Sequence, residues 1–377
     1  MATLTDPQNS RAGGHHGGNT SSAAAAASFP RLVADIGGTN ARFGWIAAPG
    51  AAVSQVQKLA VLDFAGPAEA AQAYLAWLAG QAQLAGNAAV ALQPPRQAAF
   101  AVATAVGGDR IAFTNSHWDF SRSAVQAGLG LDGLLMLNDF ESLALSLPVL
   151  AAQQLRSHAL HAAPGAAATA PAAADTPGRV LAVVGPGTGL GVGAVVATRS
   201  GWVALPGEGG HATLAPADDL ESAVLAAVRR QFAHVSAERL LSGIGLPLLH
   251  QALAQVLGAA PATLSATRSA AQIVDSAEDG SDPLSSQTLD LFCALLGGFA
   301  GNVALTLGAR GGLFIGGGIV PRFEARFFAS AFRARFEAKG RFCNYLAAIP
   351  TALIIDTLAA LSGAALAIEQ QVALAGG

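Results

Sequence analysis

Apolar runs interrupted by glycines occur twice along this chain in nearly the same form. Residues 31–36 (RLVADI) and 41–48 (ARFGWIAA) flank a Gly-Gly-Thr turn, and the stretch 183–196 (VVGPGTGLGVGAVV) places another glycine-threonine turn between two apolar runs. Strand-like runs that flank a short glycine turn are typical of a β-hairpin. The pattern therefore predicts two similar hairpins in two separate parts of the chain.

The rest of the pattern mixes strand and helix periods. Within 133–150 a continuous strand-like run (LLML) is followed by Phe140, Leu143, Ala144 and Leu147 on one helical face. The other predicted elements are an Ala-rich helix at 67–85, a hairpin formed by 98–106 and 110–116, and a last apolar helix at 358–375. Strands that alternate with helices in this way indicate an α/β fold.

A chain of 377 residues is long enough for two domains. The predicted division is a small α/β domain at 29–149 completed by 358–377 and a large α/β domain at 150–357, with hinges at 140–150 and near 357. Two segments are expected outside these cores. Residues 1–28 predict a disordered leader without the apolar core of a signal peptide, and the Ala/Pro-rich run 162–174 predicts a surface insertion that its prolines keep from forming a long helix.

Composition limits the class of partner. The net charge of −3 argues against a broad nucleic-acid-binding surface. The apolar run 291–309 is long enough to cross a bilayer, but it stands alone with Asn302 in its middle, so a buried helix and no membrane contact are predicted. Cys293 and Cys343 have no zinc-motif spacing, and we expect both to pack as small apolar residues in a protein of the reducing cytoplasm.

The glycine turns allow two interpretations. Neither has the Gly-Lys-Ser/Thr of a Walker-type phosphate loop. Residues 189–194 loosely match a dinucleotide fingerprint with Glu208 as its ribose-binding acid, but β-branched residues follow where that fingerprint needs a helix. One interpretation is a pair of ordinary turns. In the other, backbone N–H groups at the glycines and the hydroxyls of Thr39 and Thr188 hold one polyphosphate from two sides.

Five segments follow one another in the order found in bacterial glucokinases: DIGGTNARFGW (35–45), NDFESLA (138–144), GPGTGLG (185–191), LPGEGGH (205–211) and ERLLSG (238–243). From about residue 30 to about residue 370 the chain resembles this family, which belongs to the sugar kinase, actin and heat-shock ATPase superfamily. With only two distant cysteines it resembles the zinc-free group. The resemblance implies an α/β, two-lobed, actin-like (ribonuclease H-like) ATPase fold with a cleft between a small and a large domain.

The resemblance also implies an activity. A glucokinase transfers the γ-phosphate of ATP to the 6-hydroxyl of glucose, giving glucose 6-phosphate and ADP. The alternatives are a hexokinase of broader specificity and a non-catalytic, sugar-responsive protein on the same scaffold. ATP, Mg²⁺ and glucose are the expected ligands, no nucleic acid is expected to bind, and a homodimer is possible because the family often forms one.

Asp139 is the candidate catalytic residue. A sugar hydroxyl is a weak nucleophile at neutral pH, so a kinase needs a carboxylate within hydrogen-bond reach of it. Asp139 follows one predicted strand and opens a predicted helix, at the end of a sheet where α/β proteins bind ligands. A helix cap is the alternative role of this segment, because Asn138-x-x-Glu141 imitates a capping box. The resemblance implies that Asp139 is the general base.

The other site residues also follow from the resemblance. The substrate-binding residues would be Asn138, Asp139, Glu208, His211 and Glu238, with Asn115 and Ser116 as further candidates. The ATP-binding residues would be Gly37, Gly38, Thr39 and Asn40 in the first turn, Gly187, Thr188 and Gly189 in the second, and Gly316, Gly317 and Gly318 beside adenosine. Asp35 would hold Mg²⁺ through water, and no protein-only metal site is expected.

Simpler roles stay open for four of these side chains. Asp35 could be a turn acid at the end of a strand, and Glu208 could be an exposed turn residue. Glu238 could interact with a helix dipole after Ser236. His211 could be a packed or solvent-exposed histidine.

Overall fold

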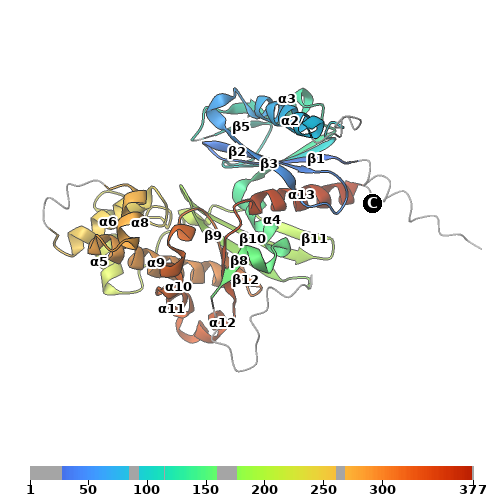
Figure 1. Ribbon diagram of the computed structural model, residues 1–377. Coiled ribbons are helices and arrows are strands. Elements are labelled where there is room, and N and C mark those ends of the chain that lie inside the picture. Colours follow the sequence, from blue (N-terminus) through green and yellow to red (C-terminus); the bar gives the residue numbers. More distant parts are fainter. Residues whose placement is uncertain (1–27, 85–92, 114, 159–175, 260–267, 376–377) are drawn as a thin grey trace, which may run out of the picture.

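The computed structural model describes residues 28–84, 93–113, 115–158, 176–259 and 268–375. Two β-sheets, each with its own helices, lie on either side of a layer of two helices (Figure 1). The predicted insertion at 162–174, and the predicted leader at 1–28 apart from its last residue, lie outside the described residues.

The first sheet has the strand order β3-β2-β1-β4-β7. Its strands are β1 (Arg31–Ile36), β2 (Asn40–Ile46), β3 (Ser54–Ala60), β4 (Gln97–Val102) and β7 (Gly133–Asn138). β1 pairs antiparallel with β2 around the first glycine turn, which confirms the first predicted hairpin, and parallel with β4. On one face Leu32 and Ile36 join a core with Tyr74 of helix α2 (Pro67–Leu84), so the predicted helix at 67–85 is also confirmed.

The predicted hairpin of 98–106 with 110–116 is wrong. β4 lies between β1 and β7 in parallel register, whereas β5 (Arg110–Ala112) pairs with β6 (Asp119–Ser121) in a separate two-stranded sheet. β4 is buried on both faces, as a central strand between two helical layers should be. Residues 107–109 (Gly-Gly-Asp), between these two segments, are typical of a turn, but the burial of β4 between two layers determined its partners.

The second sheet has the strand order β11-β10-β9-β12-β13-β8. Its strands are β8 (Leu155–Ser157), β9 (Val180–Pro186), β10 (Leu190–Thr198), β11 (Gly201–Leu205), β12 (Gly312–Ile315) and β13 (Thr351–Ile354). β9 and β10 pair antiparallel around the second glycine turn, and β10 pairs with β11, so the second predicted hairpin is confirmed. β12 runs parallel to β9 and β13.

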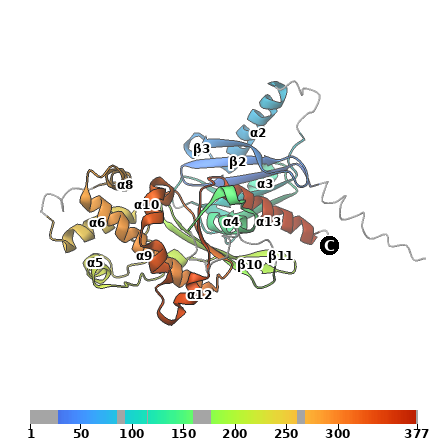
Figure 2. The same cartoon turned by 60° about the horizontal axis from the view of Figure 1, so that its bottom comes forward.

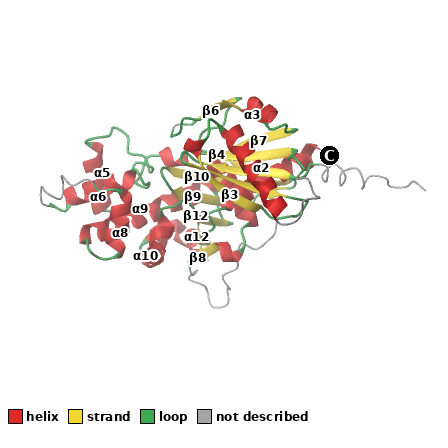
Figure 3. Ribbon diagram, turned by 45° about the horizontal axis from the view of Figure 1, so that its top comes forward, coloured by secondary structure: helices red, strands yellow, loops and turns green. Residues whose placement is uncertain are grey.

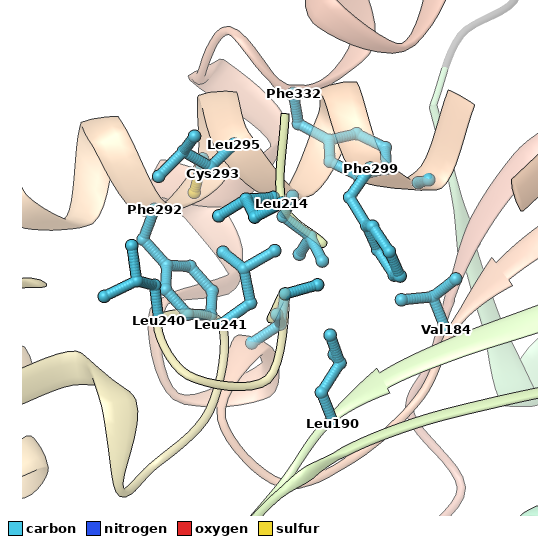
Figure 4. Close-up of a cluster of buried hydrophobic side chains, with 14 of the residues drawn as sticks. Val184, Leu190, Leu214, Leu240, Leu241, Phe292, Cys293, Leu295, Phe299 and Phe332 are labelled. Carbon is cyan, nitrogen blue, oxygen red and sulfur yellow. The ribbon is translucent and has the colours of Figure 1, made fainter. Parts of the chain in front are cut away.

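Most helices of this half gather at one end of the molecule, beyond the edge of its strands (Figure 3). They are α5 (Asp219–Arg229), α6 (Gly245–Val256), α8 (Ala270–Glu278) and α9 (Pro283–Leu307). The shorter helices α10 (Glu324–Ala329), α11 (Phe332–Glu337) and α12 (Cys343–Ala347) follow β12. Phe292 and Phe299 of α9 meet Val184 and Leu190 of the second hairpin in the largest buried cluster (Figure 4).

Helix α9 contains the apolar run that is long enough to cross a membrane. Among the described residues it is the one helix with that length and composition, and most of its apolar window is buried inside the protein. The predicted buried helix is thus confirmed. Cys293 on α9 is fully buried, but Cys343 is exposed, so the expectation that both cysteines are packed is wrong for Cys343.

Two helices form the layer between the sheets. α4 (Asp139–Ser146) and α13 (Ala359–Ala375) lie side by side (Figure 2). α4 was predicted from its apolar period and α13 as a last apolar helix, and both predictions are confirmed. Leu361 and Ile368 of α13 pack against the first sheet, whereas Leu145 of α4 belongs to a cluster with strands of the second sheet. The predicted domain boundaries and hinges stay predictions.

Candidate active site

Asp139 is the first residue of α4, directly after the last residue of β7. The side chain of Asn138 caps the helix, and Glu141 completes the capping box through the backbone N–H of Asn138. The capping alternative therefore describes Asn138 correctly, while the carboxylate of Asp139 has a different environment. Its Oδ1 accepts a hydrogen bond of 2.9 Å from the backbone N–H of Phe140.

The environment of Asp139 favours a carboxyl group that titrates near neutral pH. Partial burial raises its pKa to about 6, the hydrogen bond from Phe140 lowers it, and the negative charges of Asp35 and Glu208 raise it further. The neighbouring residue and two carboxylates from distant segments, Asp35 and Glu208, therefore act on this one carboxylate. A general base is most effective when its pKa lies close to the working pH, so this value suits proton transfer at neutral pH.

Asp35 lies two residues before the first glycine turn, on β1. It is paired across the hairpin with Arg42, whose guanidinium lies 3.1 Å from the Asp35 carboxylate. Burial raises the pKa of Asp35, and the charge of Arg42 lowers it. Arg42 is not among the predicted site residues. The register of a hairpin that turns at residues 37–40 would have placed it opposite Asp35.

The first turn contacts the segment after β5. A Cβ atom on Gly38 would lie 2.6 Å from the backbone oxygen of Asn115, so glycine is needed there for a close approach of two chain segments. Gly37 closes the turn by donating its N–H to Asn40 at 2.9 Å. Thr39 is exposed. The structure thus brings the predicted Asn115 segment against the predicted phosphate turn.

The second turn is held by neighbours from two other segments. The backbone of Gly187 accepts a hydrogen bond of 2.8 Å from Gly243. The N–H of Ile319 donates to the Pro186 oxygen at the end of β9. Gly187 itself has open space where a side chain would lie, and Thr188 is exposed. At Gly187 the backbone can therefore approach a ligand without interference from a side chain of its own.

The predicted adenosine residues adjoin this second turn. Gly317 has a left-handed φ of 79°, and a Cβ atom there would overlap the carbonyl of Pro186. Gly316 follows β12 directly and would meet Leu143 of α4 at 2.9 Å if it had a Cβ atom. Gly318 has open space around it. Two of the three glycines are thus needed for contacts within the protein.

The predicted sugar ligands His211 and Glu238 are close to each other, and Glu208 lies in the same turn as His211, whose backbone N–H donates to the Glu208 carbonyl. His211 Nε2 lies 3.8 Å from Glu238 Oε1, and both side chains retain contact with solvent. The backbone N–H of Glu238 donates to Gly210, between Glu208 and His211. Glu238 lies in a turn outside the described helices, which argues against the helix-dipole role, and its Oε2 accepts from the N–H of Leu190 at 2.9 Å.

Both polar atoms of the Asn138 side chain, a predicted sugar ligand, form hydrogen bonds within the protein. Its Oδ1 accepts hydrogen bonds from the N–H groups of Phe140 and Glu141, and its Nδ2 donates to the carbonyl of Thr104. The side chain therefore joins α4 to the segment after β4. Among the described residues no group of three or more His, Cys, Asp or Glu side chains is arranged to hold a metal ion.

Comparison with known proteins identifies the family. A family model described as Glucokinase matches residues 32–371. The glucokinase of Aromatoleum aromaticum is 45% identical over 346 residues, which cover 92% of this chain and 96% of that protein. A glucokinase of Neisseria meningitidis is 44% identical over 350 residues, covering 91% of this chain and 96% of its own. The chain belongs to the glucokinase family.

Solved structures agree with this placement. A glucokinase from an Antarctic psychrotroph has a TM-score of 0.75 and 34% identity, with coverage of 90% of this chain and 98% of that chain. A ROK family glucokinase from Streptomyces griseus, solved with glucose and AMPPNP, has a TM-score of 0.54 at 17% identity, covers 91% of this chain and all of its own, and shares the fold alone.

Membership of the glucokinase family confirms three predictions. The two-lobed, actin-like α/β fold is correct, the chain is an enzyme, and its activity is that of an ATP-dependent sugar kinase of the glucokinase type. The roles of the individual site residues stay predictions, because the family match covers the whole chain and does not assign roles to single side chains.

Proposed function

We propose that Asp139 is the general base with which this glucokinase phosphorylates the 6-hydroxyl of glucose. The observation that supports the proposal most directly is the position of Asp139, which is half-buried at the start of α4 and electrostatically coupled to Asp35 and Glu208. A carboxylate of this kind can accept a proton and still be reached by a substrate.

The proposed step conserves atoms and charge. Asp139 accepts the proton of the 6-hydroxyl as the sugar oxygen forms a bond to the γ-phosphorus of ATP. The bond between that phosphorus and the β–γ bridging oxygen breaks, and ADP leaves with the bridging oxygen. Little covalent chemistry is required of the protein in such a transfer, so rate depends on alignment and on stabilisation of the phosphoryl charge.

Glu208, His211 and Glu238 are proposed to bind the sugar hydroxyls. The proximity of His211 to Glu238, the electrostatic effect of Glu208 on Asp139 and the contact of these side chains with solvent support this role. A site that hydrogen-bonds several hydroxyls rejects analogues that lack them, because the polar groups of the site would then be left unpaired. Asn138 contributes chiefly by holding α4, and Asn115 is proposed to approach the sugar from the side of the first turn.

The two glycine turns are proposed to hold the ATP phosphates. The open space at Gly187, the exposed Thr188 and the exposed Thr39 support phosphate binding by backbone N–H and hydroxyl groups. The loop Gly316–Gly318 touches the strand end below the second turn, so we assign the adenosine to that side.

Mg²⁺ is proposed to accompany ATP near Asp35. Protein sites for Mg²⁺ commonly supply one or two carboxylates while substrate phosphates and water complete the shell. Asp35 fits this pattern, because it is a half-buried carboxylate with a second carboxylate, Asp139, in its electrostatic environment. When bound, Mg²⁺ would neutralise phosphate charge during transfer.

We propose that the enzyme works in the cytoplasm. Both cysteines, at 293 and 343, are free thiols, as is usual for proteins of a reducing compartment. The possible homodimer stays a prediction.

A coupled assay for ADP production tests the proposed reaction. Purified enzyme would be supplied with ATP, Mg²⁺ and one of several hexoses, or with no sugar. We expect rapid ADP formation with glucose and little without sugar, because closure around the sugar is needed to complete the site. Sugar-independent ADP formation at a similar rate would contradict the proposal and indicate a plain ATPase.

A further inference from the structure

The ring of Phe140 lies in a trough of the second sheet that three glycines form. Gly185 on β9 and Gly191 on β10 are direct cross-strand partners, and Gly193 lies two residues further along β10, on the same face. A Cβ atom at Gly185 or Gly191 would overlap ring atoms of Phe140. A Cβ atom at Gly193 would lie 2.8 Å from the Phe140 carbonyl oxygen. Any larger residue at these positions would displace the ring or the start of α4.

Phe140 also contacts the proposed base. Its backbone N–H lies 2.9 Å from both Asp139 Oδ1 and Asn138 Oδ1. The glycine trough belongs to the two strands that carry the second turn at residues 187–189. Phe140 therefore connects the carboxylate of Asp139 with the two strands that carry a proposed phosphate-binding turn.

The opposite side of α4 is closed by α13. A Cβ atom on Gly363 of α13 would overlap the backbone oxygen of Ser142, and the Ser142 hydroxyl donates to the Ala360 carbonyl at 2.7 Å. The helix is thus held between glycines on two sides. Loss of the Phe140 ring would leave a space on the trough side, into which the start of α4 could move.

We propose that Phe140 is a positioning residue for phosphoryl transfer. Its ring, seated on Gly185 and Gly191, sets the distance between Asp139 and the phosphates held at the second turn. The inference rests on the proposed role of Asp139 as the base. Transfer requires close alignment of the reacting groups, and a displacement of about 1 Å can lower the rate by about 100-fold.

Steady-state kinetics of Phe140→Leu and Phe140→Ala test the proposal. Leucine keeps much of the apolar volume, so this variant should fold even if alanine does not. We expect kcat to fall about 10-fold with leucine and about 100-fold with alanine. The KM values for glucose and ATP should change less than about threefold, because the lost effect is on alignment in the transition state.

Two further variants separate positioning from stability. Leu145→Ala removes a buried side chain from the same helix, and it should lower the melting temperature while kcat stays within about twofold. Gly191→Ala should lower kcat, because its methyl group would displace the Phe140 ring. In the double variant with Phe140→Ala it should have little further effect on kcat, because that ring is absent.

The proposal is overturned if the Phe140 variants keep their kcat, or if they lose kcat only as much as Leu145→Ala does. Independent losses from Gly191→Ala and Phe140→Ala would also overturn it. Asp139→Asn, measured in the same assay, distinguishes failure of the underlying function. If Asp139→Asn has normal turnover, the proposal that Asp139 is the base is wrong. If Asp139→Asn is inactive while the Phe140 variants are fully active, only the positioning role of Phe140 is wrong.

Discussion

The two glycine hairpins differ at the second residue pair from each turn. In the first hairpin this pair is Asp35 and Arg42, an ion pair at 3.1 Å. In the second it is Gly185 and Gly191, against which the ring of Phe140 rests. The same position in a glycine hairpin thus carries an ion pair in one half of the protein. In the other half it leaves room for an aromatic ring.

This difference indicates a division of roles between the two halves. The first hairpin places a carboxylate beside Asp139 and raises its pKa. The second allows α4 to approach the sheet so closely that the ring of Phe140, the residue after Asp139, rests on the two strands that lead to the turn at 187–189. Removing the charge of Asp35 and filling the space above Gly185 and Gly191 should therefore affect catalysis in different ways.

Asp35→Asn should have the largest effect of the variants in the hairpins. It keeps the shape of the residue but removes the charge proposed to hold Mg²⁺, so we expect kcat/KM to fall about 100-fold or more. The concentration of Mg²⁺ needed for half-maximal rate should rise. Asp132→Asn is the matched control, because Asp132 also pairs with an arginine, Arg96, but at an exposed position. Similar activity of the two variants would contradict the role of Asp35.

Substitutions within the second turn should separate sugar binding from ATP binding. A Cβ atom at Gly189 would overlap Glu238 Oε2, whereas one at Gly187 would have no protein atom within 4 Å. We expect Gly189→Ala to raise the KM for glucose about 10-fold by displacing Glu238, and Gly187→Ala to raise the KM for ATP by a similar factor. Equal changes for both substrates in both variants would remove the distinction.

The pH dependence of kcat/KM should report Asp139. Protonated Asp139 cannot accept the hydroxyl proton, and its pKa is raised to about 6. Below pH 6 the rate should therefore fall about tenfold per pH unit, while it stays level above pH 7. Residual activity in Asp35→Asn should show this fall at lower pH, because a negative charge near Asp139 is gone. A flat profile down to pH 4.5 would be inconsistent with Asp139 as the base.

The smallest expected effect is a gain in stability on Asp139→Asn. Because the pKa of Asp139 in the folded protein lies above its ordinary value, ionisation makes wild type less stable as pH rises from about 4 to about 6. At pH 8 the variant should be more stable by about 1 kcal/mol, a value reduced for the partial exposure of the group. Thermal unfolding without ligands should show a clearly larger gain at pH 8 than at pH 4.5.

The sequence allowed both hairpins and the main helices to be predicted, because their glycine turns and apolar periods are local signals. The partner of β4 was missed, since pairing in a parallel sheet depends on segments that lie far apart in the chain. Asp139 followed from motif order, but the roles of Arg42 and Phe140 did not. Arg42 needed the hairpin register, and Phe140 needed the close approach of α4 to the second sheet, which no local pattern describes.

The most direct test of the central claim is turnover by Asp139→Asn with binding measured in parallel. The variant keeps the size of the side chain and should bind glucose and ATP within about threefold of wild type, as isothermal titration would show. Its kcat should be lower by about 1,000-fold, in the middle of the usual range for general base catalysis. Turnover within tenfold of wild type would contradict the claim that Asp139 accepts the proton.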